Sequence, residues 1–457
     1  MRIKILFALF ILTLSGSAFS QSEDSLIIRK IYSDALLNSD SYLNLEHLCK
    51  SIGGRLCGSP QSEKAIEWIK TMLDRMGLDS VYLQETKVRN WVRGDKEYAY
   101  YETKENGKIT VNVCALGTSI GTGENGIKGK VIEVGDFDDL KKLGREQIEG
   151  KIVFFNRPLD NKFINTGPAY GDAADQRVFG AIEAAKYGAI GVIVRSLTLA
   201  TDTFPHTGVM RYVDSVKKIP AIAISSLDAG VLALYLDSEH DIDFYFRTTC
   251  YENEEKKSYN VISEIKGSEY PDEIILIGGH IDSWDTGEGA NDDGAGVVQT
   301  IDVLRIFKSL NVKPKHTIRF VAFMDEEIAQ RGARTYANAV KEKYEKHIVG
   351  IESDAGSMIP YGFSMDAPDS VVAKVQSWKN LLLPYNLFLF IKGGSGVDVS
   401  FLKKLGIPVF EMIENSQCYF DYHHSPNDVF EHVNERELQF GSASIAALVY
   451  LIDKYGL

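Results

Sequence analysis

Short apolar runs alternate with helical stripes through the second half of the chain. Residues 274–277 form a β-branched run typical of a buried strand, and Val297, Ile301 and Leu304 then recur at helical spacing. The alternation continues with predicted strands at 317–323, 348–351 and 408–413 and predicted helices at 333–342, 371–378 and 435–455. Strands that alternate with helices predict the α/β class, with a mixed, largely parallel sheet covered by helices.

The first half of the chain has a different pattern. Apolar stripes predict helices between residues 42 and 83, and alternation over 88–112 predicts strands with a hairpin turn at Asn106-Gly107. Glycines then interrupt the polar segment 117–135, which indicates a domain crossing. Short apolar strands follow on both sides of an alanine-rich helical segment. We therefore predict an inserted, mainly-β domain at residues 126–250, between the two parts of a larger domain at 21–125 and 255–457.

The N-terminus has the pattern of a targeting segment. Arg2 and Lys4 precede an apolar run at 5–14, and Ala18-Phe19-Ser20 supplies the small residues of a cleavage site. We predict a signal peptide at residues 1–20 and therefore an exported protein, either periplasmic or extracellular. The apolar run is too short to span a bilayer and no later stretch approaches the required length, so no membrane span is expected.

The composition narrows the range of partners. Removing residues 1–20 takes the formal net charge from −13 to −15, and an acidic surface argues against nucleic acid and anionic membranes. Apart from Cys49 and Cys57, the five cysteines are widely scattered. They do not resemble a disulfide framework, and we interpret most of them as small buried apolar residues.

Polar side chains follow the predicted strands where each strand ends. In chain order the clusters are His280-x-Asp282, Asp292-Asp293, Glu326-Glu327, Asp354 and His423-His424. Each cluster alone is more often a solvated loop or a helix cap. In open α/β sheets, however, ligands bind at the carboxyl ends of the strands, where these clusters converge. Together they predict a site for two adjacent divalent cations that share one bridging carboxylate.

The order of these motifs resembles that of a known enzyme family. His280-x-Asp282, Asp292, Glu326-Glu327, Asp354 and His424-Ser425-x-x-Asp428 resemble the motifs of the co-catalytic zinc aminopeptidases and glutamate carboxypeptidases. Ser283-Trp284-Asp285 and Pro205-His206-Thr207-Gly208 are similar to segments of the glutamate carboxypeptidase branch. The similarity covers nearly the whole mature chain, and the predicted insert resembles a protease-associated domain.

The resemblance implies a zinc exopeptidase fold with two Zn²⁺ ions per chain. Asp292 would bridge the two ions. His280 and Asp354 would complete one site, and Glu327 and His424 would complete the other.

The resemblance also implies two catalytic residues. Glu326 would be the general base that takes a proton from the attacking water and delivers it to the leaving amine. Asp282 would accept a hydrogen bond from His280 and so fix the imidazole tautomer. Two positions depart from the family pattern: Ala329 stands where glycine is common, and Asp398 matches its segment only in part, which leaves its role open.

The implied function is a metallo-exopeptidase whose partners are dipeptides or short peptides, with a homodimer left open. Two alternatives share the fold: a non-catalytic, receptor-like binding protein and a single-zinc glutaminyl cyclase. The first would be expected to have lost ligands, whereas all five are present, and the second lacks the insert. We expect the insert to cover the cleft with the 205–208 segment; a docking module that never meets substrate is the alternative.

Overall fold

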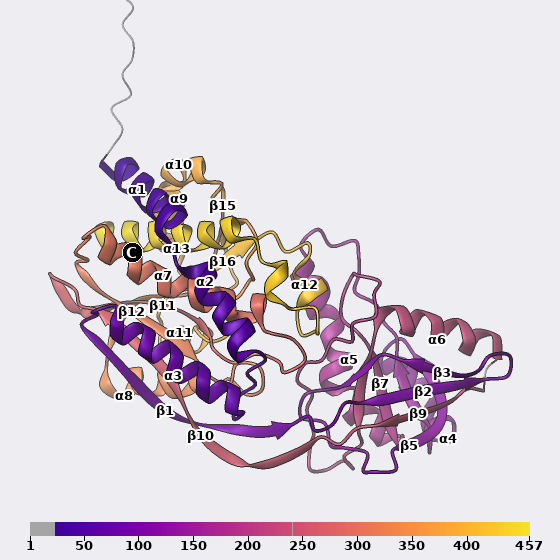
Figure 1. Ribbon diagram of the computed structural model, residues 1–457. Helices are drawn as coiled ribbons and strands as arrows, with labels where there is room; N and C mark the ends of the chain where they lie inside the picture. The colour runs from indigo at the N-terminus through magenta and orange to yellow at the C-terminus, as the bar shows by residue number, and fades with distance from the viewer. Residues whose placement is uncertain (1–22, 240) are drawn as a thin grey trace, which may run out of the picture.

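Two sheets organise the chain. The computed structural model describes residues 23–239 and 241–457, so the predicted signal peptide lies outside the described residues. Figure 1 shows one sheet with its helices on the left and the other on the right. The first is eight-stranded, in the order β1-β10-β12-β11-β13-β16-β14-β15. The second is also eight-stranded, in the order β3-β2-β9-β5-β6-β7-β8-β4.

The first sheet is mixed, with its parallel strands at the centre. Its strands are β1 (Ser80–Val92), β10 (Tyr251–Ile265), β11 (Tyr270–His280), β12 (His316–Phe323), β13 (Lys346–Glu352), β14 (Pro360–Asp366), β15 (Leu389–Lys392) and β16 (Val409–Glu414). β11 runs parallel to β12 and to β13, and β13 runs parallel to β16. β1, β10 and β14 join by antiparallel pairing. The predicted mixed, largely parallel sheet is confirmed.

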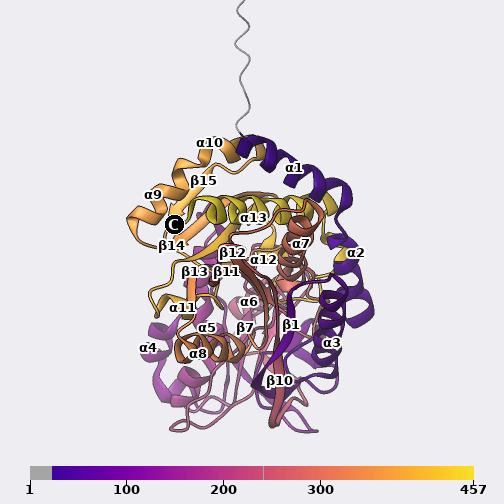
Figure 2. The same cartoon turned by 90° about the vertical axis from the view of Figure 1, so that its left-hand side faces the viewer.

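Helices cover both faces of this sheet. They are α1 (Glu23–Asn38), α2 (Ser41–Glu46), the π-helical turn η1 (His47–Ile52), α3 (Pro60–Arg75), η2 (Ala290–Gly294), α7 (Ala295–Ser309), α8 (Arg331–Lys343), α9 (Asp369–Ser377), α10 (Lys379–Leu382), η3 (Leu383–Tyr385), α11 (Ser400–Lys403), α12 (Tyr419–Tyr422), η4 (Phe430–His432) and α13 (Glu435–Tyr455). α1, α3, α7 and α13 pack on one face, and α8 and α11 pack on the other. Figure 2 shows α3 and α8 on opposite sides of β1 and β10. Because both faces are covered, every residue of β12 is buried.

The second sheet carries helices as well. Its strands are β2 (Tyr98–Thr103), β3 (Gly107–Val111), β4 (Val113–Ala115), β5 (Ile127–Val134), β6 (Ile152–Phe155), β7 (Gly191–Arg195), β8 (Ala221–Ile224) and β9 (Asp243–Arg247), with helices α4 (Phe137–Ile148), α5 (Thr166–Lys186) and α6 (Ser226–Glu239). β2 pairs with β9, so this sheet takes in strands that precede the expected start of the insert at residue 126. Alternation of polar and apolar residues predicts a strand but does not say which strand it pairs with. This part was expected to be mainly β, but it also contains three helices.

Two long strands connect the two parts. β1 leaves the first sheet and leads into the second, and β10 returns antiparallel to it. Directly after β1, the Arg93 guanidinium forms ion pairs with Asp285 at 2.6 Å and with Glu97 at 3.1 Å. These contacts tie the start of the second part to the loop after β11.

Two further expectations can be compared with the structure. All five cysteines carry free thiols, and only Cys418 is exposed, as expected for small buried apolar residues. Within residues 23–239 and 241–457, no helix is long and apolar enough to cross a membrane.

Candidate metal centre

The five predicted ligands meet at one edge of the first sheet. His280 is the last residue of β11, Glu327 follows β12, and Asp354 lies two residues after β13. Asp292 lies in η2, directly before α7, and His424 follows α12. Parallel strands bring their carboxyl ends to the same edge, which is why segments so far apart in the sequence converge.

Asp292 lies between two groups of side chains. Its Oδ1 is 3.1 Å from His280 Nε2, which is 3.5 Å from Asp354 Oδ1. Its Oδ2 is 3.3 Å from His424 Nε2, which is 3.1 Å from Glu327 Oε2. One carboxylate thus offers one oxygen to each group, which is the arrangement of a bridging ligand.

The residues fit a divalent cation chemically. Within the described part of the chain, His280 Nε2, Asp292 Oδ2 and Glu327 Oε1 are buried and have no hydrogen-bond partner. Burial lowers the pKa of His280, but the carboxylates of Asp354 and Asp292 outweigh it and hold that pKa well above its usual value. Buried carboxylates and imidazoles with free lone pairs are suitable ligands for a cation, which would offset this concentration of negative charge.

The surroundings of His424 shift its pKa in the opposite direction from that of His280. Burial, and next the neighbouring His423 and the Arg177 guanidinium, lower the pKa of His424 well below its usual value. The imidazole is therefore neutral, which is the form that binds a metal. Its backbone has φ = 61°, a left-handed conformation that non-glycine residues seldom adopt away from functional sites.

Asp282 contacts His280 through its main chain. His280 Nδ1 lies 2.9 Å from the main-chain carbonyl oxygen of Asp282, which can only accept a hydrogen bond. Nδ1 therefore carries a proton, so in the neutral ring the lone pair is on Nε2, which faces Asp292 and Asp354. The Asp282 carboxylate instead accepts the main-chain N–H groups of Asp325 at 2.8 Å and Glu326 at 3.1 Å.

Glu326 lies beside the ligands without joining them. Its neighbour Glu327 is within ion-pair distance of His424, whereas the described residues give the Glu326 carboxylate no ion pair. Burial, together with the carboxylates of Asp354 and Asp292, raises the pKa of Glu326 well above its usual value although His280 opposes this. Glu326 is a half-buried residue whose carboxylate interacts with the ligand carboxylates, a position that suits a proton acceptor.

Two aspartates fix the loop that carries Asp292. The Asp428 carboxylate accepts the main-chain N–H groups of Asn291 at 2.8 Å and Asp292 at 3.2 Å. The Asp293 carboxylate accepts the main-chain N–H groups of His280 at 3.0 Å and Gly296 at 2.9 Å. The main chain on both sides of the shared carboxylate is therefore held in place.

The sequence analysis did not give His423 a role. Its Nε2 is 3.5 Å from Asp292 Oδ2, and its ring stacks on His424 with the centroids 3.5 Å apart. Asp292, His423 and His424 form a group that could hold a metal ion, as do His280, Asp292 and Asp354. Burial lowers the pKa of His423 to about 4. The only sequence signal for His423 was its place in a pair of adjacent histidines.

The second part of the chain reaches this site. Thr207 donates its main-chain N–H to the carbonyl oxygen of His424 at 2.8 Å. The His206 ring nitrogen Nδ1 lies 2.8 Å from the carbonyl oxygen of His423. Gly208 has φ = 131°, and a Cβ there would lie 2.4 Å from Arg177 Nη1 and 2.7 Å from His424 Nδ1. Only glycine allows the 205–208 segment to approach the paired histidines so closely.

Arg177 brings a positive charge to the same place. It lies on α5, is 6% exposed, and its Nε has no hydrogen-bond partner among the described residues. Its Nη1 contacts the Tyr170 hydroxyl at 2.6 Å, the Thr207 carbonyl at 3.5 Å and His424 Nδ1 at 3.4 Å. None of these partners is an anion, which is unusual for a buried guanidinium.

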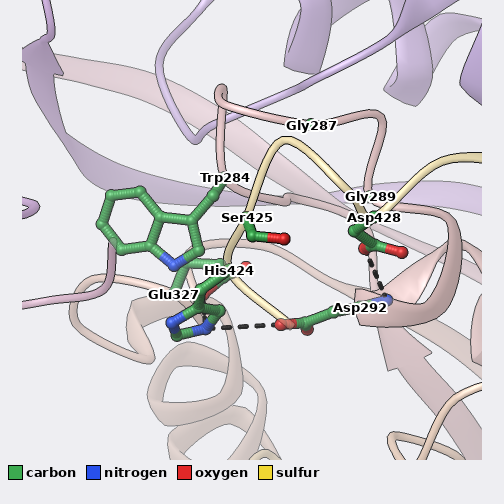
Figure 3. Close-up of a pocket in the computed structure, with 8 residues that line it drawn as sticks. All are labelled: Trp284, Gly287, Gly289, Asp292, Glu327, His424, Ser425 and Asp428. Carbon is green, nitrogen blue, oxygen red and sulfur yellow. Dashed lines mark hydrogen bonds and ion pairs between the residues drawn. The ribbon is translucent and has the colours of Figure 1, made fainter. Parts of the chain in front are cut away.

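A small cavity adjoins the second group of ligands. Figure 3 shows its lining: Trp284, Gly287, Gly289, Asp292, Glu327, His424, Ser425 and Asp428. The Trp284 ring meets His424 edge-on, with the centroids 5.7 Å apart. Side chains that the sequence separates by more than a hundred residues thus enclose one space.

Two imidazole–carboxylate groups joined by Asp292, at the carboxyl ends of parallel strands, define a metallopeptidase. Residues 260–449 match the model of peptidase family M28, and the chain belongs to this family. It is a metallo-exopeptidase.

The chain is similar in sequence to carboxypeptidase Q. The chain is 32% identical to carboxypeptidase Q of Bos taurus over 428 residues, which cover 94% of this chain and 88% of the relative. It is also 32% identical to carboxypeptidase Q of Homo sapiens over 90% of this chain and 85% of that protein.

Solved structures agree on the fold. A peptidase M28 precursor from Shewanella amazonensis is 33% identical, with a TM-score of 0.90 over 95% of this chain and 97% of that one. A zinc aminopeptidase from Bacillus subtilis, 20% identical, shares the fold with a TM-score of 0.63 over 90% of this chain and 94% of its own.

Proposed function

We propose that the chain is an exported di-zinc exopeptidase that hydrolyses dipeptides and short peptides, with Glu326 as the general base. One observation carries this proposal: Asp292 presents Oδ1 to His280 at 3.1 Å and Oδ2 to His424 at 3.3 Å. A carboxylate shared in this way is expected where two cations are bound together. His280 and Asp354 would hold one ion, and Glu327 and His424 the other.

Zinc is the metal that suits these donors best. Imidazole nitrogen and carboxylate oxygen are its usual ligands besides thiolate. The relative from Bacillus subtilis is described as a zinc aminopeptidase, which supports the same choice. When bound, two such ions lower the pKa of a water molecule and polarise the scissile carbonyl.

The protein's own part in the reaction is proton transfer and positioning. Glu326 would accept a proton from the attacking water and return it to the leaving amine. The Asp282 carboxylate would keep Glu326 in place by accepting the main-chain N–H of Glu326. The main-chain carbonyl of Asp282 would hold His280 in the tautomer whose Nε2 faces the metal.

The second part of the chain supports a short substrate with a free carboxylate. Arg177 is a buried cation that has no anionic partner among the described residues and lies next to His424. Once His424 binds a cation through Nε2, its Nδ1 carries the proton and no longer accepts from Arg177. The guanidinium is then available to the terminal carboxylate of a dipeptide. We propose the second part as a protease-associated domain that closes one side of the cleft.

The alternatives lack comparable support. A single-zinc cyclase needs one group of ligands, whereas two groups surround Asp292. A non-catalytic binding protein has no use for a carboxylate such as Glu326, held by Asp282 beside the ligands.

A panel of dipeptides tests the proposal. The zinc-loaded protein should hydrolyse free dipeptides, and N-acetylated or C-amidated versions should react more slowly. Chelation should abolish turnover, and two zinc ions per chain should restore it. The function is refuted if the zinc-loaded protein hydrolyses none of these dipeptides, or if turnover survives complete removal of metal.

A further inference from the structure

The indole of Trp284 is held rigidly beside the candidate metal centre. Trp284 follows β11 by four residues and is 3% exposed. Its ring packs edge-on against Trp91, with the centroids 6.4 Å apart, and against His424 at 5.7 Å. On the side of the second sheet, a Cβ placed on Gly117, two residues after β4, would lie 1.8 Å from its six-membered ring. The ring thus fills a space that only glycine leaves open, and it has no room to turn away.

The Trp284 N–H group has no acceptor. Its Nε1 is buried and forms no hydrogen bond within residues 23–239 and 241–457. An indole nitrogen can only donate, and a buried tryptophan usually finds a partner. The neighbouring Trp91 does so, because its Nε1 donates to the carbonyl oxygen of Ser119 at 2.8 Å. Two tryptophans in one core therefore differ: one is satisfied internally, and the other keeps a free donor.

The free donor faces the cavity of the second ligand group. Trp284 lines this cavity together with Asp292, Glu327 and His424. In Figure 3 the indole nitrogen lies on the side of the ring that faces His424 and Glu327. The unpaired oxygens nearby, Asp292 Oδ2 and Glu327 Oε1, belong to side chains that would bind the metal. The N–H group is therefore free to meet an acceptor that arrives with the substrate.

We propose that Trp284 Nε1–H donates a hydrogen bond to the oxygen of the scissile carbonyl, and that this bond strengthens as the oxygen gains negative charge. This inference rests on the proposed peptidase function. A fixed donor in a buried site favours the charged oxygen over the neutral one and needs no rearrangement when the charge develops. Trp284 is then a catalytic residue in addition to Glu326.

The matched variants Trp284→Phe and Trp91→Phe test this role. Trp284→Phe keeps most of the ring and removes the N–H group, so kcat should fall roughly 10²-fold while KM and zinc content change little. Trp91→Phe removes an internal hydrogen bond from the same core and keeps a ring against Trp284, so it should lower the melting temperature and change kcat far less than Trp284→Phe does. A structural role for Trp284 would instead change zinc content or stability, as in an ordinary core variant.

Binding of an inhibitor supplies a measurement independent of turnover. A phosphinic dipeptide analogue, which imitates the tetrahedral carbon and its charged oxygens, should bind Trp284→Phe more weakly by about the factor lost in kcat/KM. The product amino acids should bind as tightly as they bind the wild type. Both dissociation constants can be measured by calorimetry.

The possible failures can be told apart. A kcat within threefold of wild type in zinc-replete Trp284→Phe would overturn the role of Trp284 and leave the peptidase function standing. If Trp284→Phe does not fold, benzothienylalanine at position 284 keeps the shape of the ring without the N–H group, and the same two outcomes apply. If the wild type hydrolyses no dipeptide at all, it is the proposed function that fails.

Discussion

Asp282 Oδ1 accepts the main-chain N–H of Glu326 at 3.1 Å, and the same oxygen accepts the N–H of Asp325 at 2.8 Å. Asp325 has φ = 73°, so the turn after β12 bends through a conformation that needs support. The aspartate of the His-x-Asp motif therefore holds the segment that carries the proposed base. Its main-chain carbonyl, on the other side, holds His280.

This division of roles predicts a difference between two substitutions of Asp282. Asp282→Asn keeps an oxygen that can accept both N–H groups, whereas Asp282→Ala removes it. We expect Asp282→Ala to lower kcat by about 10- to 100-fold and Asp282→Asn to lower it less, with zinc retained in both. Steady-state kinetics and elemental analysis measure these effects. Equal losses in the two variants would show that the charge matters and the acceptor does not.

The two adjacent glutamates should respond differently to the same change. Glu326→Gln should keep zinc and lose kcat by at least ~10²-fold, because the amide cannot take a proton. Glu327→Gln should lose metal as well, since its carboxylate lies 3.1 Å from His424 Nε2 in the ligand group. Near wild-type turnover in Glu326→Gln would contradict the assignment of the base.

The metal content of ligand variants should follow the position of each ligand. His280→Ala and His424→Ala should each lower the zinc content, because each removes a ligand from one group. Asp292→Asn should lower it further, since Asp292 contacts both groups. Elemental analysis after dialysis gives the count per chain. Unchanged zinc in both histidine variants would rule out the site.

Arg177 should discriminate between free and amidated substrates. Arg177→Gln should raise KM about 10- to 100-fold for a dipeptide with a free carboxylate, the range of a hydrogen bond to a charged group, and change little for its amide. Arg157→Gln is the control, because Arg157 already pairs with Asp175. If Arg177→Gln weakens both substrates equally, the guanidinium does not bind the carboxylate.

His206 should act through the segment that it contacts. Burial lowers the pKa of His206 to about 3, so its ring is neutral, and its Nδ1 meets the His423 carbonyl at 2.8 Å. His206→Ala should raise KM more than it lowers zinc content. His206→Asn can place an amide N–H where Nδ1 was, and it should restore much of the lost affinity. Efficient cleavage of long peptides, with no kinetic effect of His206→Ala, would refute the covering role of this segment.

The sequence by itself determined the fold class, and its resemblance to a known family supplied the five proposed ligands. Helical and strand periodicities are local properties, so the run at 274–277 and the stripe after it predicted β11 and α7 directly. Parallel strands end at one edge of a sheet, so the order of the polar clusters was enough to predict that His280, Asp292 and Asp354 would meet.

Only the tertiary structure decided which atoms and which distant side chains complete the site. Residue spacing cannot separate the carbonyl of Asp282 from its carboxylate, and these two groups contact different partners. Arg177 and His424 are separated by 247 positions, and their contact depends on how the second sheet packs against the first. The fixed position of the Trp284 ring depends likewise on the packing of Gly117, which follows β4 of the second sheet. Such contacts are fixed by packing between segments with no common periodicity, and a sequence pattern therefore does not contain them.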